Sequence, residues 1–157
     1  MKLFTTEEIR AIDRATIDGE AVSPLELIER VGEGVASEIA TRWRSNKPTI
    51  VFAGPGNNGA DALAAARLLW ERGFRPDVYL FNIGGDKLSA DCAALRDRLL
   101  REIPEIQFCE VQTRFTMPKI TSAHLVIDGL FGSGLREELK GGFKSLVQNL
   151  NDEDATV

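Results

Sequence analysis

The chain has 157 residues, a length typical of one globular domain, and its content of 43% hydrophobic and 27% charged residues suits a core that needs no disulfide or metal. A net charge of -5 and a pI near 5.0 argue against nucleic-acid binding, which normally requires a basic face. Residues 1–20 carry acidic side chains and no continuous apolar stretch, which excludes a signal peptide and a membrane span and makes the cytoplasm the expected location.

Two helices are predicted at the start of the chain. Thr5 with Glu8, and Ser23 with Glu26, each fit the capping box that begins a helix. The second helix carries an apolar stripe at three- and four-residue spacing, formed by Ile28, Val31, Val35, Ile39 and Trp43. Small residues lie beside it at Gly32, Gly34 and Ala36. We favour packing of this stripe on the chain's own sheet, and a helix contact across a dimer interface stays open.

From Pro48 onward, short apolar runs alternate with helical patterns, which is typical of βαβ units. The predicted strands are 49–53, 78–82, 106–111 and 124–128, and the predicted helices are 61–72, 89–103 and 143–150. Strand 106–111 is short and is expected near an edge. The sequence therefore predicts an α/β fold, a Rossmann-like doubly wound, mostly parallel sheet with helices on both faces, preceded by the two N-terminal helices.

The tail at residues 151–157 is a polar turn followed by two β-favouring residues, so a fifth strand is expected to start there. A helix at 143–150 would otherwise lack the strand to which its crossover leads. We therefore expect residues 1–157 to be a single domain that is incomplete at its C-terminus, a piece of a longer gene product.

A Gly-rich turn, Gly54 to Asp61, follows the first predicted strand and opens a helix, the context in which backbone N–H groups hold an anionic ligand. The turn is not a Walker A motif, because no Gly-Lys-Ser/Thr follows, and it is not a strict G-x-G-x-x-G. Asn57 and Asn58 suit a polar ligand or a hard cation. The turn could equally be structural, with the asparagines in unusual backbone conformations and Asp61 capping the helix.

A second Gly-rich turn, Asp128 to Gly134, follows strand 124–128. In doubly wound sheets the first and fourth strands commonly flank the point where strand order reverses, and ligands bind outside their carboxyl ends. We therefore expect the two turns to converge on one site, where Asn58 and Asp128 could offer oxygen ligands to a single hard cation.

Three other residues are predicted to be structural. Cys92 and Cys109 form no metal-ligand pattern and are expected to be reduced, packed thiols. His124, the one histidine, precedes an apolar strand and is expected to be a strand-edge residue rather than a base.

Three segments carry a resemblance to a known family: GPGNNGADAL at 54–63, VIDGLFGSGL at 126–135 and ERVGEGVA at 29–36. The sequence resembles the YjeF N-terminal domain family, the NAD(P)H-hydrate epimerases, whose hallmark is a strand followed by a Gly-Pro-Gly-Asn-Asn-Gly-Gly-Asp loop. The resemblance covers nearly the whole chain in the right order. It implies cofactor repair, in which the R and S forms of hydrated NADH and NADPH (NADHX and NADPHX) are interconverted so that a partner dehydratase can use the S form.

The resemblance also implies a set of site residues. The substrate would contact Asn57, Asn58, Gly59, Ala60, Asp61, Gly132, Ser133, Gly134, Leu135, Arg136, Glu137 and Glu138. A potassium ion would be held by Asn58 and Asp128 and would organise the two turns. The family resemblance further suggests a homodimer, with the dehydratase either fused to this domain or separate.

Two departures from the family pattern stand in this sequence. Ala60 and Ala62 replace glycines; a Cβ at position 60 could crowd the approach to a ligand, or the alanines could simply start the helix more firmly. The family's strand and Pro-Ser-Gly turn that carries the presumed catalytic aspartate is expected beyond Val157, so the catalytic residue is not identified. We therefore expect the 157-residue piece to be inactive or nearly so.

Two other functions compete with the epimerase. A non-catalytic module of the same fold would bind a nucleotide-like metabolite or a protein partner, which the two glycine losses would permit. A Rossmann dehydrogenase is disfavoured, because Phe81 and Asn82 stand at the end of the second strand where an acidic residue would read the ribose.

Overall fold

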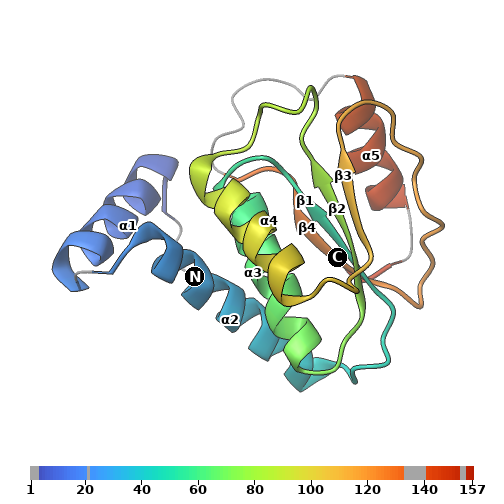
Figure 1. Cartoon of the computed structure of the whole chain (residues 1–157), viewed down its shortest axis with the longest axis horizontal. Helices are drawn as coiled ribbons and strands as arrows, with labels where there is room; N and C mark the ends of the chain where they lie inside the picture. The colour runs from blue at the N-terminus through green and yellow to red at the C-terminus, as the bar shows by residue number, and fades with distance from the viewer. Residues whose placement is uncertain (1–3, 21, 133–140, 153–154) are drawn as a thin grey trace.

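The computed structural model describes residues 4–20, 22–132, 141–152 and 155–157 (Figure 1). Four strands form one sheet: β1 (Thr49–Ala53), β2 (Pro76–Phe81), β3 (Phe108–Val111) and β4 (Leu125–Gly129). All three strand pairings are parallel and the order is β3-β2-β1-β4. The predicted parallel sheet and the edge position of the third strand are confirmed. Strand order reverses between β1 and β4.

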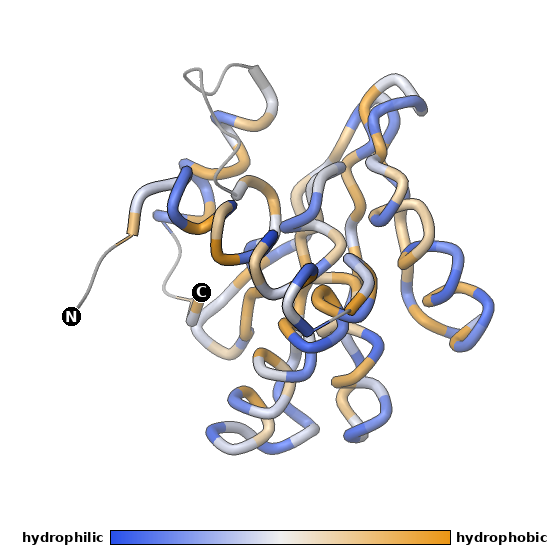
Figure 2. Tube along the Cα trace, turned by 90° about the vertical axis from the view of Figure 1, so that its left-hand side faces the viewer, coloured by the Kyte–Doolittle hydropathy of each residue, from blue (hydrophilic) through white to orange (hydrophobic). Residues whose placement is uncertain are grey.

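Helices cover both faces of the sheet, as predicted (Figure 1). On one face, α3 (Asn57–Glu71) and α4 (Ala90–Glu102) pack on the strands, and α2 (Pro24–Arg42) packs on α3. On the other face lies α5 (Gly141–Asp152), together with the segment that connects β3 to β4. Along these helices hydrophobic and hydrophilic segments alternate (Figure 2), which is the pattern of helices that bury one side only.

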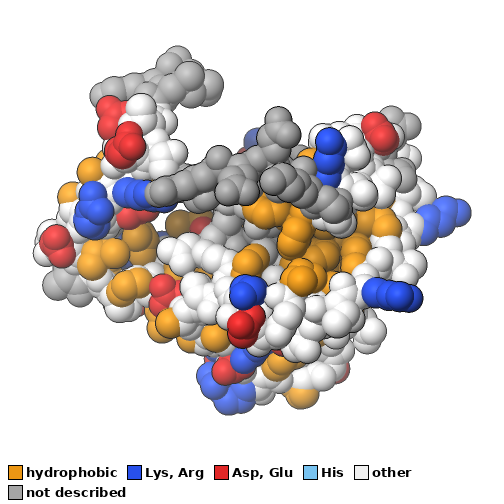
Figure 3. Space-filling model, turned by 90° about the horizontal axis from the view of Figure 1, so that it is seen from above, with side chains coloured by type: hydrophobic (Ala, Val, Ile, Leu, Met, Phe, Trp, Pro, Cys, Tyr) orange, Lys and Arg blue, Asp and Glu red, His pale blue; other side chains and the backbone are white. Residues whose placement is uncertain are grey.

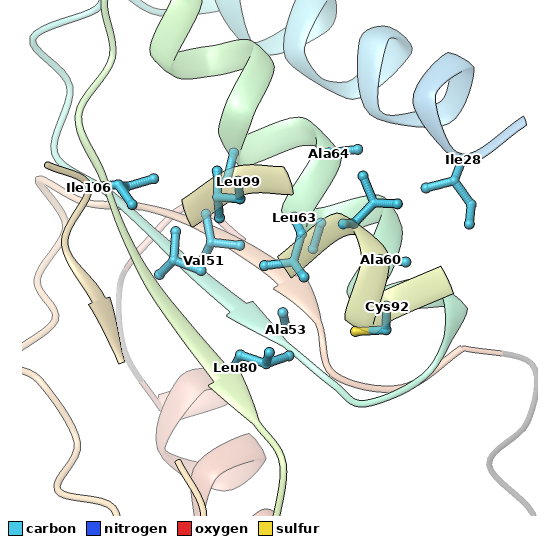
Figure 4. Close-up of a cluster of buried hydrophobic side chains, with 14 of the residues drawn as sticks. Ile28, Val51, Ala53, Ala60, Leu63, Ala64, Leu80, Cys92, Leu99 and Ile106 are labelled. Atoms are coloured by element: carbon cyan, nitrogen blue, oxygen red, sulfur yellow. The ribbon is translucent and has the colours of Figure 1, made fainter. Parts of the chain in front are cut away.

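The core is divided by the sheet, because successive strand residues point to opposite faces. Val51 and Ala53 of β1 join the cluster under α3 and α4 (Figure 4), whereas Ile50 and Phe52 join the cluster under α5. All five residues of β1 are buried. A central strand that is covered on both faces has a continuous apolar sequence. The bounds of β1 could therefore be predicted correctly from the sequence.

The apolar stripe of α2 is divided between two environments. Ile28 and Ile39 are buried within the chain, and Gly32 lies so close to α3 that a Cβ added there would stand 2.6 Å from Cβ of Ala64. These residues pack within the chain, but mainly on α3 rather than on the sheet as predicted; Ile39 also belongs to the cluster that includes Leu125 of β4. Val31 and Val35 remain exposed, at 43% and 36%. The stripe of α2 therefore has a buried part, with Ile28 and Ile39, and an exposed part, with Val31 and Val35.

A network of charged side chains ties α2, α3 and α4 together. Arg67 of α3 has a side chain that is only 7% exposed, and its guanidinium contacts Glu29 at 2.5 Å, Glu71 at 2.6 Å and Glu102 at 3.6 Å. Arg98 of α4 also contacts Glu29, at 2.7 Å. Within the described helices, none combines the length and the apolar character needed to cross a membrane.

The first helix, α1 (Thr6–Glu20), buries none of its residues and projects from the body of the molecule (Figure 1). At the other end of the chain, Thr156 forms a parallel bridge beside Leu125 at the free edge of β4, and its carbonyl oxygen accepts a hydrogen bond from Val126 at 2.7 Å. The predicted start of strand pairing in the tail is therefore confirmed at this residue.

Candidate functional site

The two Gly-rich turns lie side by side at the carboxyl end of the sheet. Ala53 and Gly129 are register partners at the ends of β1 and β4, and the N–H of Gly54 donates to the carbonyl oxygen of Gly129 at 2.9 Å. Both turns thus leave the sheet where strand order reverses, which confirms their predicted convergence.

The first turn is shorter than predicted, because α3 begins at Asn57 and not at Asp61. Gly56 is the N-cap and provides no side-chain cap, so Asp61 is not the capping residue. Ala60 donates its N–H to the carbonyl oxygen of Gly56 at 3.1 Å, which leaves the N–H groups of residues 57–59 without acceptors inside the helix. Three backbone donors and the positive end of the helix dipole form a place for an anionic group.

Glycines are required in the turns because three backbone segments touch. A Cβ added to Gly54 would lie 2.0 Å from the carbonyl oxygen of Leu130, and one added to Gly59 would lie 1.8 Å from the carbonyl oxygen of Gly54. Both distances are far below van der Waals contact. The first turn is therefore held between the start of α3 and the second turn, with no room for side chains at these positions.

Asn58 and Asp128, the predicted cation ligands, both contact the second turn but from different sides. Asn58 of α3 donates its amide N–H to the carbonyl oxygen of Phe131 at 3.0 Å. Asp128 is the register partner of Phe52 and so belongs to the α5 face, where its Oδ1 accepts the N–H of Leu130 at 3.0 Å. Among the described residues, no group of three or more His, Cys, Asp or Glu side chains could hold a metal ion.

Asp61 is a half-buried carboxyl group in the second turn of α3. Burial and, to a smaller extent, the nearby carboxyl group of Asp13 on α1 together raise the pKa of Asp61 to about 6. Desolvation is the larger cause, because a carboxylate loses hydration energy when it leaves water. Asp61 therefore changes its charge near neutral pH, and α1 contributes to this even though it is weakly packed.

The two alanines that depart from the family pattern fit the structure. Ala60 is fully buried, and its methyl group belongs to the cluster between α3 and the sheet (Figure 4). Ala62 faces Gly129, where an added Cβ would lie 2.5 Å from the Ala62 methyl group. Both side chains therefore point into the core, and of the two expected effects the firmer helix start agrees with the early beginning of α3.

Residues at the N-terminus of α4 contact the backbone of the first Gly-rich turn. Ser89 donates its N–H to the carbonyl oxygen of Pro55 at 2.8 Å, and Sγ of Cys92 lies 3.6 Å from the carbonyl oxygen of Gly54. Burial raises the pKa of the Cys92 thiol to about 11, so it stays protonated and can donate. Cys92 is a packed thiol as predicted. The same prediction was wrong for Cys109, which is exposed on the edge strand β3.

The remaining predicted residues are placed as follows. Gly132 is exposed, and a Cβ added to it would lie 3.2 Å from Cβ of Asn58. His124 precedes β4, at the opposite end of the sheet, and its Nδ1 contacts the Thr121 hydroxyl at 3.0 Å, so it is a strand-edge residue. Six predicted substrate contacts lie outside the described residues: Ser133, Gly134, Leu135, Arg136, Glu137 and Glu138.

The end of β2 carries no free carboxylate for a ribose. Asn82 is buried there, its amide donates to Glu110 at 2.6 Å, and its Oδ1 accepts the N–H of Lys87 at 2.9 Å. Glu110 comes from the neighbouring strand and contacts Arg96 at 3.4 Å. The argument against a dehydrogenase therefore holds, although sequence reasoning missed Glu110, because it is brought to this position by strand pairing.

The chain matches known proteins over most of its length. Residues 24–157 match the family model described as YjeF-related protein N-terminus. A protein of Rhodobacter capsulatus named NAD(P)H-hydrate epimerase is 35% identical over 147 residues, which are 89% of this chain and 66% of that protein. A protein of Dictyoglomus turgidum named bifunctional NAD(P)H-hydrate repair enzyme Nnr is 29% identical over 97% of this chain and 29% of its own length.

The fold also has a counterpart among solved structures. The crystal structure of the yeast protein ynu0 matches with a TM-score of 0.75 over 97% of this chain and 65% of the yeast chain, at 23% identity. The chain thus spans just under two thirds of the length of the yeast and Rhodobacter proteins.

Proposed function

Because this chain belongs to the family of YjeF-related protein N-terminal domains, we propose that it carries the ligand-binding turns of an NAD(P)H-hydrate epimerase. The reaction interconverts the R and S forms of NADHX and NADPHX. The observation that carries the proposal is the contact between the two turns, where Asn58 of one binds the Phe131 carbonyl of the other at the switch point of the sheet. Relatives that span the matched turns bear the epimerase name.

The geometry suits a dinucleotide. The unpaired N–H groups of residues 57–59 would hold an anionic phosphate group of the substrate at the start of α3. Asn58 and Asp61 are three residues apart near the start of α3. The predicted contacts at Gly132 and residues 133–138 belong to or follow the second Gly-rich turn. We propose this set as the substrate-binding residues.

We further propose that Asn58 and Asp128 hold a potassium ion. The amide nitrogen of Asn58 donates to Phe131, and Oδ1 of Asp128 accepts from Leu130. Within the described part of the chain, Oδ1 of Asn58 and Oδ2 of Asp128 have no hydrogen-bond partner. Two side-chain oxygens suit a hard cation, which would need further oxygen ligands from backbone or water. Such an ion would fix the two turns against each other.

The cation proposal is tested by thermal unfolding in matched concentrations of potassium and lithium chloride. We expect potassium alone to raise the Tm, and the Asn58→Ala variant to lose that increase. Asn46→Ala is the matched control, because Asn46 is exposed in a turn that precedes β1, at the opposite end of the sheet. An equal change of Tm in potassium and lithium chloride for the unaltered protein would contradict the proposed potassium site.

A homodimer and a dehydratase partner complete the proposal. Six of the nine large exposed hydrophobic residues in the described part of the chain lie on or next to α1 and α2: Phe4, Ile9, Ile12, Leu25, Val31 and Val35. This surface, named the α1/α2 face below, is suited to a second copy of the chain. The relative from Dictyoglomus turgidum is bifunctional by name, which supports a dehydratase fused to, or acting after, this domain. The cytoplasm is the location that we propose for both.

The test of function is the rate at which the complete protein equilibrates a prepared single epimer of NADHX, followed by NMR or chromatography against a protein-free control. We expect rapid equilibration without net oxidation or reduction. The Asn58→Ala variant is expected to lose about two orders of magnitude in kcat/KM, because the side-chain hydrogen bond between the two turns is lost, and Asn46→Ala is expected to retain full activity. Binding of NADHX without equilibration would instead favour the non-catalytic module.

A further inference from the structure

A cavity of about 340 Å³ lies on the α5 face, beside the carboxyl ends of β2 and β3. Its walls come from Phe81 at the end of β2, from Phe115 and Met117 in the segment after β3, and from Phe143 and Leu146 of α5. This volume falls within the range of small-molecule sites, which are mostly apolar with a few polar groups. Figure 3 shows apolar side chains gathered in a hollow on the side of the molecule where the strands end.

The lining restricts the chemistry of a ligand. No Asp, Glu, Lys, Arg or His side chain is among the described residues that line the cavity. Thr113 and Ser145 bring hydroxyls to its wall and Asn149 brings an amide. An uncharged, flat ring with donors and acceptors on its edge fits such a lining, because aromatic walls stack on it and these polar groups reach its edge.

The cavity is joined to the candidate site by aromatic contacts. The ring of Phe143 lies 5.5 Å from that of Phe81 and 5.1 Å from that of Phe131, measured between centroids. Phe131 is the residue whose carbonyl oxygen accepts the amide of Asn58. One wall of the cavity therefore continues into the second Gly-rich turn, so a single extended ligand could occupy both.

We propose that this cavity binds the adenine ring of the dinucleotide substrate, an inference that rests on the proposed function. In doubly wound dinucleotide-binding sheets the phosphates lie at the first βα turn and the adenosine ribose is read at the end of the second strand. Here the donors for an anionic group are at the start of α3, after β1, and the cavity adjoins the end of β2. Adenine is uncharged at neutral pH, in agreement with the lining.

The experiment uses adenosine as the probe, which carries the ring without phosphates or nicotinamide. Adenosine is titrated into the isotope-labelled protein, and backbone amide shifts are followed by NMR. We expect shifts at residues 113–117 and 142–149. Gly142 lines the cavity, and no described atom lies within 4 Å of a Cβ added there. The Gly142→Leu variant, which adds a side chain at this wall, is expected to weaken adenosine binding about tenfold.

The matched control is Gln148→Leu, which adds the same side chain to an exposed position of α5 that does not line the cavity, and its affinity should be unchanged. Thr113 is an exposed residue of the cavity wall, and Thr113→Glu, which places a charge there, should also weaken adenosine binding. Adenosine shifts confined to residues 54–61, or equal affinity in all variants, would overturn the inference. NADHX equilibration, measured separately on the complete protein, tests the epimerase. Adenosine binding in the cavity without turnover of NADHX would support the cavity as the adenine site and contradict the proposed reaction.

Discussion

Gly54 is the residue at which the two turns come closest, and its substitution tests how tightly they are held. A methyl group there would lie 2.0 Å from the Leu130 carbonyl oxygen, and backbone cannot move away as a flexible side chain can. We expect Gly54→Ala to lower the free energy of unfolding by about 3 kcal/mol, measured by urea denaturation. Gly56→Ser is the control, because no described atom lies within 4 Å of a Cβ at this N-cap position. Equal stability of both variants would contradict the close approach.

Asp61 links protonation to stability with an unusual sign. Its folded-state pKa of about 6 lies above the ordinary value of 3.8, so the folded protein binds more protons than the unfolded chain between these values. Stability should therefore fall as pH rises from about 4 to about 6. We expect Asp61→Asn to remove this part of the pH dependence and to raise the unfolding free energy at pH 7 by about 1 kcal/mol, less than the full pKa difference implies because the carboxyl group is partly solvated.

Urea unfolding of both proteins at several pH values from 4 to 7 provides the measurement. Asp13→Asn, which keeps the carboxyl group of Asp61 but removes its like-charged neighbour, should leave most of the slope, since burial is the larger cause. An identical slope in Asp61→Asn and the unaltered protein would contradict the raised pKa of Asp61.

Single positions differ in how well sequence reasoning could place them. The meeting of the two turns was predictable, because the strands before them occupy neighbouring places in a doubly wound sheet. That Asp128 belongs to the α5 face follows from strand alternation only once Val126 and Phe52 are known to share that face. The contact of Asn58 with a backbone carbonyl 73 positions away, and that of Cys92 with Gly54, are set by tertiary packing that no local pattern encodes.

Among the elements, α2, α3 and α4 depend on the charged network around Arg67. Its guanidinium is nearly buried and Glu29 is 23% exposed, so removing the cation leaves a poorly solvated carboxylate with Arg98 as its remaining cationic contact. We expect Arg67→Met to lower the unfolding free energy by about 3 kcal/mol. Arg42→Met removes a pair of similar length with Glu38 on the surface of α2, where both side chains are at least 60% exposed, and should cost less than about 0.5 kcal/mol. Similar losses in the two variants would contradict the structural role of burial.

Helix boundaries were predictable where side chains set them. Ser23 and Glu26 form the capping box of α2 as predicted, and Ser89 caps α4 through the N–H of Cys92 at 3.2 Å. The start of α3 was predicted four residues too late, because its N-cap is a glycine without a side chain and Asn57, Asn58 and Gly59 are typical turn residues. Burial of Gly59 and Ala60 against neighbouring segments keeps this turn helical against its local preference.

For the whole molecule, the proposed homodimer depends on the α1/α2 face. Because none of the α1 residues is buried, its apolar side chains are available to a second copy of the chain. We expect a dimer in sedimentation experiments over a range of concentrations, and Val31→Glu with Val35→Glu to raise the dimer Kd by roughly thirtyfold or more. Leu100→Glu is the control, since Leu100 is similarly exposed on α4. A monomer at every concentration would contradict this assignment.

The division of the core by the sheet has a spectroscopic consequence. Both tryptophans, Trp43 and Trp70, pack in the clusters on the α2/α3/α4 side. The one tyrosine, Tyr79, stacks on Phe52 at 5.6 Å in the aromatic cluster on the α5 side. Tryptophan fluorescence therefore monitors the side covered by α2, α3 and α4, whereas the near-ultraviolet dichroism of tyrosine monitors the side covered by α5. Coincident denaturation curves from the two chromophores would mean that the layers melt as one cooperative unit, and separated curves would reveal a half-folded intermediate.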